Sequence, residues 1–274
     1  MKSQMIKNLL IKKYILKNDI YTKNFNTTKQ KDEFEMRISV AKKNYYNYYD
    51  QISKFHSIEV MDREIIKFTK HLKKNSIILD LGCGWCWHWR NINKLRPDII
   101  IVAIDFIKEN FEHAKKILPK SSLKQFFFIN DNIQQINFKK EVFDSIWTVQ
   151  VFQHIPNLKQ VVKESYRVLK PGGTLFNYNL NESIFVKIKK VFINNKKIDK
   201  YYYLNRNLSN NNKLFTKIFN TQVYNEFNEI LFHPEIKFFL GSKDSLFSKI
   251  DASLSGNGLL RSYLARQVLM KITK

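Results

Sequence analysis

Short apolar runs alternate with amphipathic segments through the middle of the chain. The apolar runs predict buried strands, and they lie at 76–80, 99–104, 125–129, 143–149 and 174–178. Segments with helical spacing lie between them, at 85–95, 111–118 and 158–169. Buried strands that alternate with helices form right-handed crossovers, so the pattern predicts an α/β fold with a mostly parallel sheet and helices on both faces.

The two flanks of this region have different patterns. Residues 1–34 are polar and basic, which predicts a loose arm or a surface helix, and residues 35–74 have helical spacing. After residue 182 the alternation stops, and a Lys-rich stretch leads to a helix predicted at 214–231. We expect strands at 236–240 and 263–272 to complete a sheet of seven strands.

These changes of pattern predict four parts of the chain. They are a basic N-terminal extension (1–34), a helical cap (35–74), a core (75–182), and a lid-like basic insertion with the C-terminal completion of the sheet (183–274).

The chain has 274 residues and a formal net charge of +23. Such a field attracts anions, including nucleic acid, phosphorylated substrates and anionic membrane surfaces. Compositional bias explains the charge equally well, because 39 of the 47 basic residues are Lys. The two cysteines exclude a disulfide framework and a four-Cys zinc site, and no metal site is expected. The low number of cysteines and the lack of a recognisable secretory segment favour a cytoplasmic protein, with peripheral membrane contact as an alternative.

A glycine turn follows the first predicted strand, at Gly82-Cys83-Gly84. Such a turn exposes backbone N–H groups and lets a ligand approach the main chain. A dinucleotide site needs a third glycine, but Trp87 stands at that position, which disfavours nicotinamide and flavin. Asp105 ends the second strand, where a carboxylate can accept both hydroxyls of a ribose or act as a helix N-cap.

Five segments in order resemble the motifs of class I (Rossmann-like) S-adenosylmethionine-dependent methyltransferases. The first and second motifs correspond to residues 77–84 and 102–105, and the adenine-binding turn to residues 130–133. Residues 143–155 resemble the fourth-strand signature, and residues 164–173 the helix and turn before strand five. The resemblance covers roughly residues 70–180.

The resemblance implies S-adenosylmethionine as the cofactor and a set of residues that bind it. Its methionine part would contact the first motif and the end of strand four, and its adenosine part would contact the second motif and the adenine turn. The implied cofactor-binding residues are Asp80, Gly82, Cys83, Gly84, Asp105, Phe106, Asp131, Asn132, Ile133, Val149 and Gln150.

The helix predicted after the glycine turn departs from the family pattern. The family usually has glycine or a small residue where this chain has Cys86. Trp85 and Trp89 are expected to share one helix face, while Trp87 points elsewhere. Core packing is the favoured interpretation of these rings, and a stacking wall for adenine or acceptor is the alternative. Cys83 and Cys86 also fit a C-x-x-C redox pattern, which the turn explains better.

His154 follows the fourth strand and is the candidate general base, since methyl transfer to a hydroxyl benefits from one. A structural histidine is an equally good interpretation. Gln153 replaces the Glu that this family often has before such a histidine.

Strand four lacks the Asn/Asp-Pro-Pro-aromatic tetrapeptide of amino methyltransferases. This favours a small-molecule acceptor, methylated on oxygen, such as a glycan, lipid or quinone-like precursor. Tyrosines at 45–49 are expected to close over the cofactor. A phosphorylated or lipid-linked acceptor, or a membrane, would meet lysines of the insertion; these are Lys187, Lys189, Lys190, Lys196 and Lys197. The alternatives are an RNA methyltransferase, with nucleic acid the less favoured partner, and a non-catalytic cofactor-binding interaction module.

Overall fold

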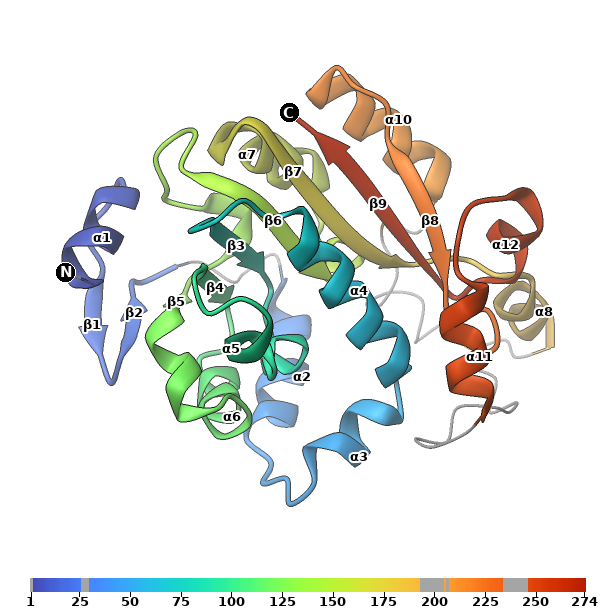
Figure 1. Cartoon of the computed structure of the whole chain (residues 1–274), viewed down its shortest axis with the longest axis horizontal. Helices are drawn as coiled ribbons and strands as arrows, with labels where there is room; N and C mark the ends of the chain where they lie inside the picture. Colours follow the sequence, from blue (N-terminus) through green and yellow to red (C-terminus); the bar gives the residue numbers. More distant parts are fainter. Residues whose placement is uncertain (1, 26–29, 193–204, 206, 234–245) are drawn as a thin grey trace.

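One mixed sheet organises the molecule. The computed structural model describes residues 2–25, 30–192, 205, 207–233 and 246–274. Its strands follow the order β1-β2-β5-β4-β3-β6-β7-β9-β8 (Figure 1). The central strands are β3 (Ile77–Leu81), β4 (Ile100–Asp105), β5 (Phe126–Asn130), β6 (Phe143–Val149) and β7 (Leu169–Leu180). They pair in parallel, which confirms the predicted sheet.

Both edges of the sheet carry additional strands. At one edge β9 (Gln267–Thr273) runs antiparallel to β7, and β8 (Tyr224–Asn228) runs antiparallel to β9. At the other edge β2 (Ile20–Thr22) pairs in parallel with β5, and β1 (Ile15–Lys17) pairs with β2. The described sheet therefore has nine strands rather than the predicted seven, because the N-terminal extension adds two.

Helices cover the two faces of the sheet, and each face has its own apolar core. One core contains residues of α1 (Lys2–Leu9), α7 (Leu158–Val168) and α10 (Leu208–Phe219). The other contains residues of α4 (Ile58–His71), α5 (Ile92–Leu95) and α6 (Glu109–Ile117). Side chains alternate between the faces along each strand, so that Ile78 joins the second core and Leu79 the first.

The continuous helix predicted at 85–95 is wrong. The chain instead forms a short 3-10 turn, η2 (Trp87–Trp89), and the brief helix α5. Cys86 has φ +54, a left-handed conformation that a helix cannot include. Trp85 and Trp89 therefore do not share a helix face.

The helix predicted at 214–231 is also wrong in part. Helix α10 ends at Phe219, where Asn220 adopts φ +56 and its N–H donates to the Thr216 carbonyl. The chain then turns into β8, whose partner β9 lies far along the sequence. A spacing rule cannot anticipate this pairing.

Two other predictions about the elements need adjustment, and a third falls outside the described residues. The segment 263–272 divides into the end of α12 (Leu259–Leu264) and strand β9. The turn predicted at 170–173 forms a bulge within β7, where the register passes from Phe143 opposite Leu169 to Ser145 opposite Thr174. The strand predicted at 236–240 lies outside the described residues, as do Lys196 and Lys197.

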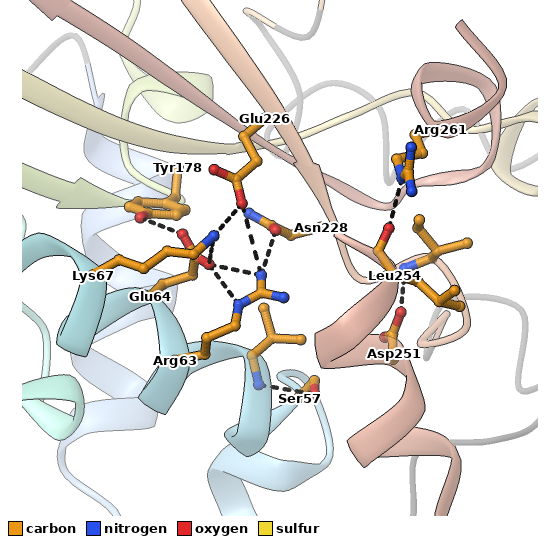
Figure 2. A network of polar contacts seen from close by, with 12 residues as sticks. Ser57, Arg63, Glu64, Lys67, Tyr178, Glu226, Asn228, Asp251, Leu254 and Arg261 are labelled. Atoms are coloured by element: carbon orange, nitrogen blue, oxygen red, sulfur yellow. Dashed lines mark hydrogen bonds and ion pairs between the residues drawn. The ribbon is translucent and has the colours of Figure 1, made fainter. Parts of the chain in front are cut away.

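The predicted helical cap comprises α2 (Lys31–Ala41), α3 (Tyr48–Ser53) and α4. Helix α4 is joined to the sheet by a network of charged side chains (Figure 2). The buried Glu64 contacts Arg63 at 2.6 Å and Lys67 at 3.2 Å, and accepts from the Tyr178 hydroxyl at 2.9 Å. Lys67 also contacts Glu226 on β8. The network therefore fixes α4 against β7 and β8.

The C-terminal part contributes α8 (Ile184–Phe192), α11 (Leu246–Leu254) and α12, which lie near one another at one end of the molecule (Figure 1). A search for membrane-spanning segments in the described part of the chain finds no helix with the necessary length and apolar character.

Candidate functional site

A cavity of about 680 Å³ opens at the carboxyl ends of the parallel strands, bordered by α2, α3 and the start of α4. In open α/β sheets ligands bind at this edge. Ten residues predicted from the sequence line it, namely Gly82, Cys83, Gly84, Asp105, Phe106, Asn132, Ile133, Val149, Gln150 and His154. Asp80 and Asp131 are the two predicted residues that do not.

The glycine turn forms the floor of the cavity. Gly82 and Gly84 have φ values of +71° and +51°, which side chains disfavour. A Cβ on Gly82 would lie 2.5 Å from Val151 Cγ2, whereas a Cβ on Gly84 would meet no atom within 4 Å. The turn is therefore packed on the Gly82 side and open on the Gly84 side, where a ligand has room to approach the backbone.

Asp105 is buried beside this turn. Its carboxylate accepts from the N–H groups of Gly84 and Ile107, each at 2.8 Å, and from Asn110 Nδ2 at 3.2 Å. Burial raises the pKa of Asp105 to about 6, although the backbone donors oppose this. The N-cap of α6 is Lys108, so the alternative role of Asp105 as a helix N-cap is wrong. The carboxylate instead links the glycine turn to the end of β4.

Asp131 lies behind the cavity wall. It accepts from the Tyr14 hydroxyl at 2.5 Å and contacts Lys23 Nζ at 3.1 Å. Its other oxygen accepts from the Asn132 N–H at 2.8 Å. The N-terminal extension therefore supports the turn at residues 130–133 from outside the cavity, while Asn132 and Ile133 line the cavity.

Asp80 also lies behind the wall, at the end of β3. Its Oδ2 atom accepts from Trp89 Nε1 at 2.7 Å and contacts His88 Nε2 at 3.1 Å. Its buried Oδ1 atom has no hydrogen-bond partner among the described residues, and the same holds for Trp87 Nε1 and Glu33 Oε2. Trp87 and Glu33 line the cavity. Buried polar atoms need partners, so the unpaired atoms of Trp87 and Glu33 fit a polar ligand in the cavity.

The two cysteines are buried and free. Burial raises the pKa of both the Cys83 and the Cys86 thiols. Reactive C-x-x-C thiols have lowered pKa values, so these two lack the character of a redox pair.

The tryptophans divide between core and cavity. Trp89 is fully buried and belongs to the second core, as the packing interpretation expected. Trp85 and Trp87 line the cavity. The Trp85 ring lies 4.7 Å from the Tyr45 ring and 5.5 Å from the Tyr48 ring. The tyrosine segment therefore packs beside the turn, and Tyr45 reaches the cavity.

His154 lines the cavity between α2 and the end of β6. Its Nε2 atom lies 3.3 Å from an Arg37 guanidinium nitrogen and 3.1 Å from Gln153 Nε2. Gln153 is oriented by its own oxygen, which accepts from the Leu180 N–H at 2.9 Å. Arginine and amide nitrogens only donate, so Nε2 of His154 accepts and is unprotonated.

Several cavity residues were missed from the sequence. They are Glu33 and Arg37 on α2, His56 before α4, and Arg266 before β9. Each lies outside the segments that resemble known motifs. The scarcity of Arg in a Lys-rich chain was an available signal for Arg37 and Arg266.

Comparisons with known proteins find methyltransferases that resemble the part of the chain that contains most of this site. Residues 79–177 match a family model described as a methyltransferase domain. A sterol 24-C-methyltransferase of Neurospora crassa is 32% identical over 108 residues, which are 39% of this chain and 28% of the relative. A ubiquinone/menaquinone biosynthesis C-methyltransferase of Wigglesworthia glossinidia brevipalpis is 26% identical over 132 residues, 47% of this chain and 53% of the relative.

The fold has solved counterparts as well. The structure of a SAM-dependent methyltransferase from Thermotoga maritima aligns with a TM-score of 0.60 and 17% identity, covering 88% of this chain and 98% of that one. This likeness confirms the predicted fold. The chain spans about a quarter to a half of the length of the two curated relatives.

Proposed function

We propose that this chain, whose residues 79–177 are a class I methyltransferase domain, transfers a methyl group from S-adenosylmethionine to a small-molecule acceptor. The observation that carries the proposal is the convergence of ten predicted residues on one cavity at the carboxyl ends of the parallel strands. Methyltransferases are the shared description of the family model and the relatives.

The proposed donor site uses the cavity floor. The open backbone at Gly84, with Gly82 and Cys83, would hold the methionine part, and Val149 and Gln150 would border it. Asp105 and Phe106 would bind the ribose, since a carboxylate accepts from two hydroxyls at once. Asn132 and Ile133 would border the adenine. We propose that Asp80 and Asp131 position these elements from behind the wall.

Bound S-adenosylmethionine supplies an electrophilic methyl group next to the positive sulfur. The enzyme's own task is to align the acceptor with this group and to exclude water. We propose that His154 takes the acceptor proton as the acceptor oxygen forms its bond to the methyl carbon. Its unprotonated Nε2 atom suits a base, and the acceptor hydroxyl would replace Arg37 as its donor.

Apolar side chains line much of the remaining cavity, and they are Met36, Val40, Ile52, Phe55, Met61 and Leu180. They support an acceptor with an apolar body, such as a lipid or quinone-like precursor, with a glycan as an alternative. The relatives named for sterol and quinone methylation support the same class. We propose that the protein is cytoplasmic. A lipid-linked acceptor would then bind at a membrane surface, which Lys187 and the lysines that follow it in the sequence would contact.

Isothermal titration with S-adenosylmethionine tests the donor site. Wild-type protein is expected to bind, and Asp105→Ala is expected to bind at least about tenfold more weakly, because hydrogen bonds to a charged group are lost. Glu112→Ala, which removes an exposed carboxylate from α6, is the matched control and should bind normally. Unchanged affinity in Asp105→Ala would contradict the assignment.

A tritiated-methyl transfer screen then tests catalysis. Label in a small-molecule extract supports the proposal, label in total RNA supports the RNA alternative, and binding without transfer supports a non-catalytic module. The RNA alternative also predicts binding that weakens steeply between 50 and 200 mM salt.

A further inference from the structure

A buried ion pair lies at the part of the cavity wall that the proposed donor site does not use. Arg266 donates to Glu229 Oε2 at 2.5 Å, and both side chains are buried. Arg266 precedes β9 and Glu229 follows β8, and the Arg266 N–H donates to the Glu229 carbonyl at 2.9 Å. Arg266 lines the cavity, whereas Glu229 is not among the lining residues. The Glu229 carboxylate therefore fixes the side chain of a residue that lines the cavity.

This arrangement is costly for a purely structural pair. Glu229 is fully buried and has φ +56, a conformation that costs energy for a residue with a side chain. Burial raises the pKa of Glu229 to about 7 against the opposing effect of Arg266. Buried ion pairs often stabilise no better than apolar residues. Strained backbone conformations such as that of Glu229 cluster at active sites and ligand-binding sites.

The same carboxylate also positions His56. The other oxygen, Glu229 Oε1, accepts from the Ser57 N–H at 3.1 Å, directly after His56. His56 lines the cavity, and its Nδ1 atom lies 3.5 Å from Gln150 Nε2. An amide nitrogen only donates, so this contact fits a neutral ring whose Nδ1 atom accepts and whose proton lies on Nε2. Burial, with Arg266 nearby, lowers the pKa of His56 to about 3, which keeps the ring neutral.

The charges around the cavity favour an anionic ligand on this side. Glu33 is paired with Arg37 at 2.8 Å, and Asp105 is committed to the donor site in the proposed function. The other charged side chains that line the cavity in the described part of the chain are Lys54 and Arg266, both cations, and the Glu229 carboxylate that pairs with Arg266 is not among the lining residues.

We propose that the acceptor is an anion whose carboxylate or phosphate group binds Arg266 and the Nε2–H group of His56. The inference rests on the proposed function, because it assigns the acceptor half of the same cavity. A guanidinium offers two parallel donors to a carboxylate or a phosphate. An acceptor held here by its anionic group is fixed beside Gln150, at the end of β6 where the methyl group would lie.

Isothermal titration on the full chain tests this site with defined probes. Protein saturated with S-adenosylhomocysteine is titrated with benzoate, phenyl phosphate and the neutral benzamide. At least one anion is expected to bind about tenfold or more tightly than benzamide, because charged hydrogen bonds add to the shared ring contact. The tighter anion identifies the acceptor group as carboxylate or phosphate.

Variants locate the binding group. Arg266→Gln should lose the preference for the anion, Arg266→Lys should retain part of it, and Lys217→Gln, at an exposed position of α10 outside the cavity lining, should keep it in full. His56→Phe leaves the ion pair intact and should lower the affinity for the anion several-fold. This variant provides the test if Arg266→Gln does not fold. Equal binding of all three probes, or an unchanged preference in folded Arg266→Gln or His56→Phe, would overturn the proposal. If the wild-type protein binds an anion more tightly than benzamide but does not bind S-adenosylhomocysteine, the result contradicts the proposed function alone.

Discussion

Asp105 is a buried carboxylate whose protonation state should control donor binding. Burial raises its pKa to about 6, so the group is ionised above that pH and protonated below it. An ionised carboxylate accepts from ribose hydroxyls, and a protonated one loses part of this capacity. We expect the affinity for S-adenosylhomocysteine to fall by up to about tenfold per pH unit below pH 6. Titration calorimetry between pH 5 and 8 measures it, and Asp105→Asn should bind more weakly with a flat pH dependence.

Gln153 should set the protonation of the proposed base. Its amide nitrogen faces His154 Nε2, while its oxygen is used by Leu180. Gln153→Glu keeps the contact with Leu180 but places a carboxylate beside the imidazole, which favours the protonated ring. Because a base must be unprotonated, the pH at which kcat rises should move upward by about one unit. The same substitution at the exposed Gln160 should leave the kcat profile in place, and an unmoved profile in Gln153→Glu would argue against His154 as the base.

Arginine is used selectively in this chain. Only eight of the basic residues are Arg, and the seven that the structure describes each hold a specific acceptor. Arg96, for example, binds Asp98 and three backbone carbonyls. A planar, forked donor makes such contacts where lysine cannot. Where composition favours Lys, a remaining Arg therefore marks a position with a defined partner.

At the scale of elements, the central strands and α6 and α7 were predicted from the sequence because each is a local pattern of sufficient length. The failures have conformational or long-range causes. Cys86 adopts a left-handed conformation inside an apolar, helix-like segment, and the usual glycine of the family at this position was the available clue. The pairing of β8 with β9 depends on residues about 40 positions away or more. For the same reason the cavity residues in the motif segments were predicted from the sequence and Arg266 was not.

The attachment of α4 to the sheet should contribute strongly to stability. Glu64 is buried among Arg63, Lys67 and the Tyr178 hydroxyl (Figure 2). Glu64→Gln removes the buried one of the two carboxylates that face these cations, Glu64 and Glu226, and we expect the loss to cost about 2 to 3 kcal/mol of unfolding free energy, near the lower end for a buried pair. Urea denaturation measures this. Glu35→Gln, in the exposed pair with Lys31, should cost less than about 0.5 kcal/mol, and equal effects of the two substitutions would contradict the role of the network.

At the scale of the whole molecule, donor binding should stabilise the native state. A ligand that binds only the folded chain adds about 2.7 kcal/mol to the unfolding free energy at 100 times its Kd. We expect S-adenosylhomocysteine to shift the urea midpoint upward accordingly. Asp105→Asn should need proportionally more ligand for the same shift. A midpoint that does not move at saturating ligand would show that the cavity does not hold this molecule.

The ion pair between Glu229 and Arg266 has a consequence for how this protein can diverge. Every residue proposed for the donor lies between 80 and 150, whereas both members of the pair lie in the last fifth of the chain. Replacements in that last fifth can alter the acceptor without touching the donor residues. If the proposed anion site is correct, the charge preference for the acceptor can therefore change in a stretch that is separate in sequence from the residues proposed to recognise the methyl donor.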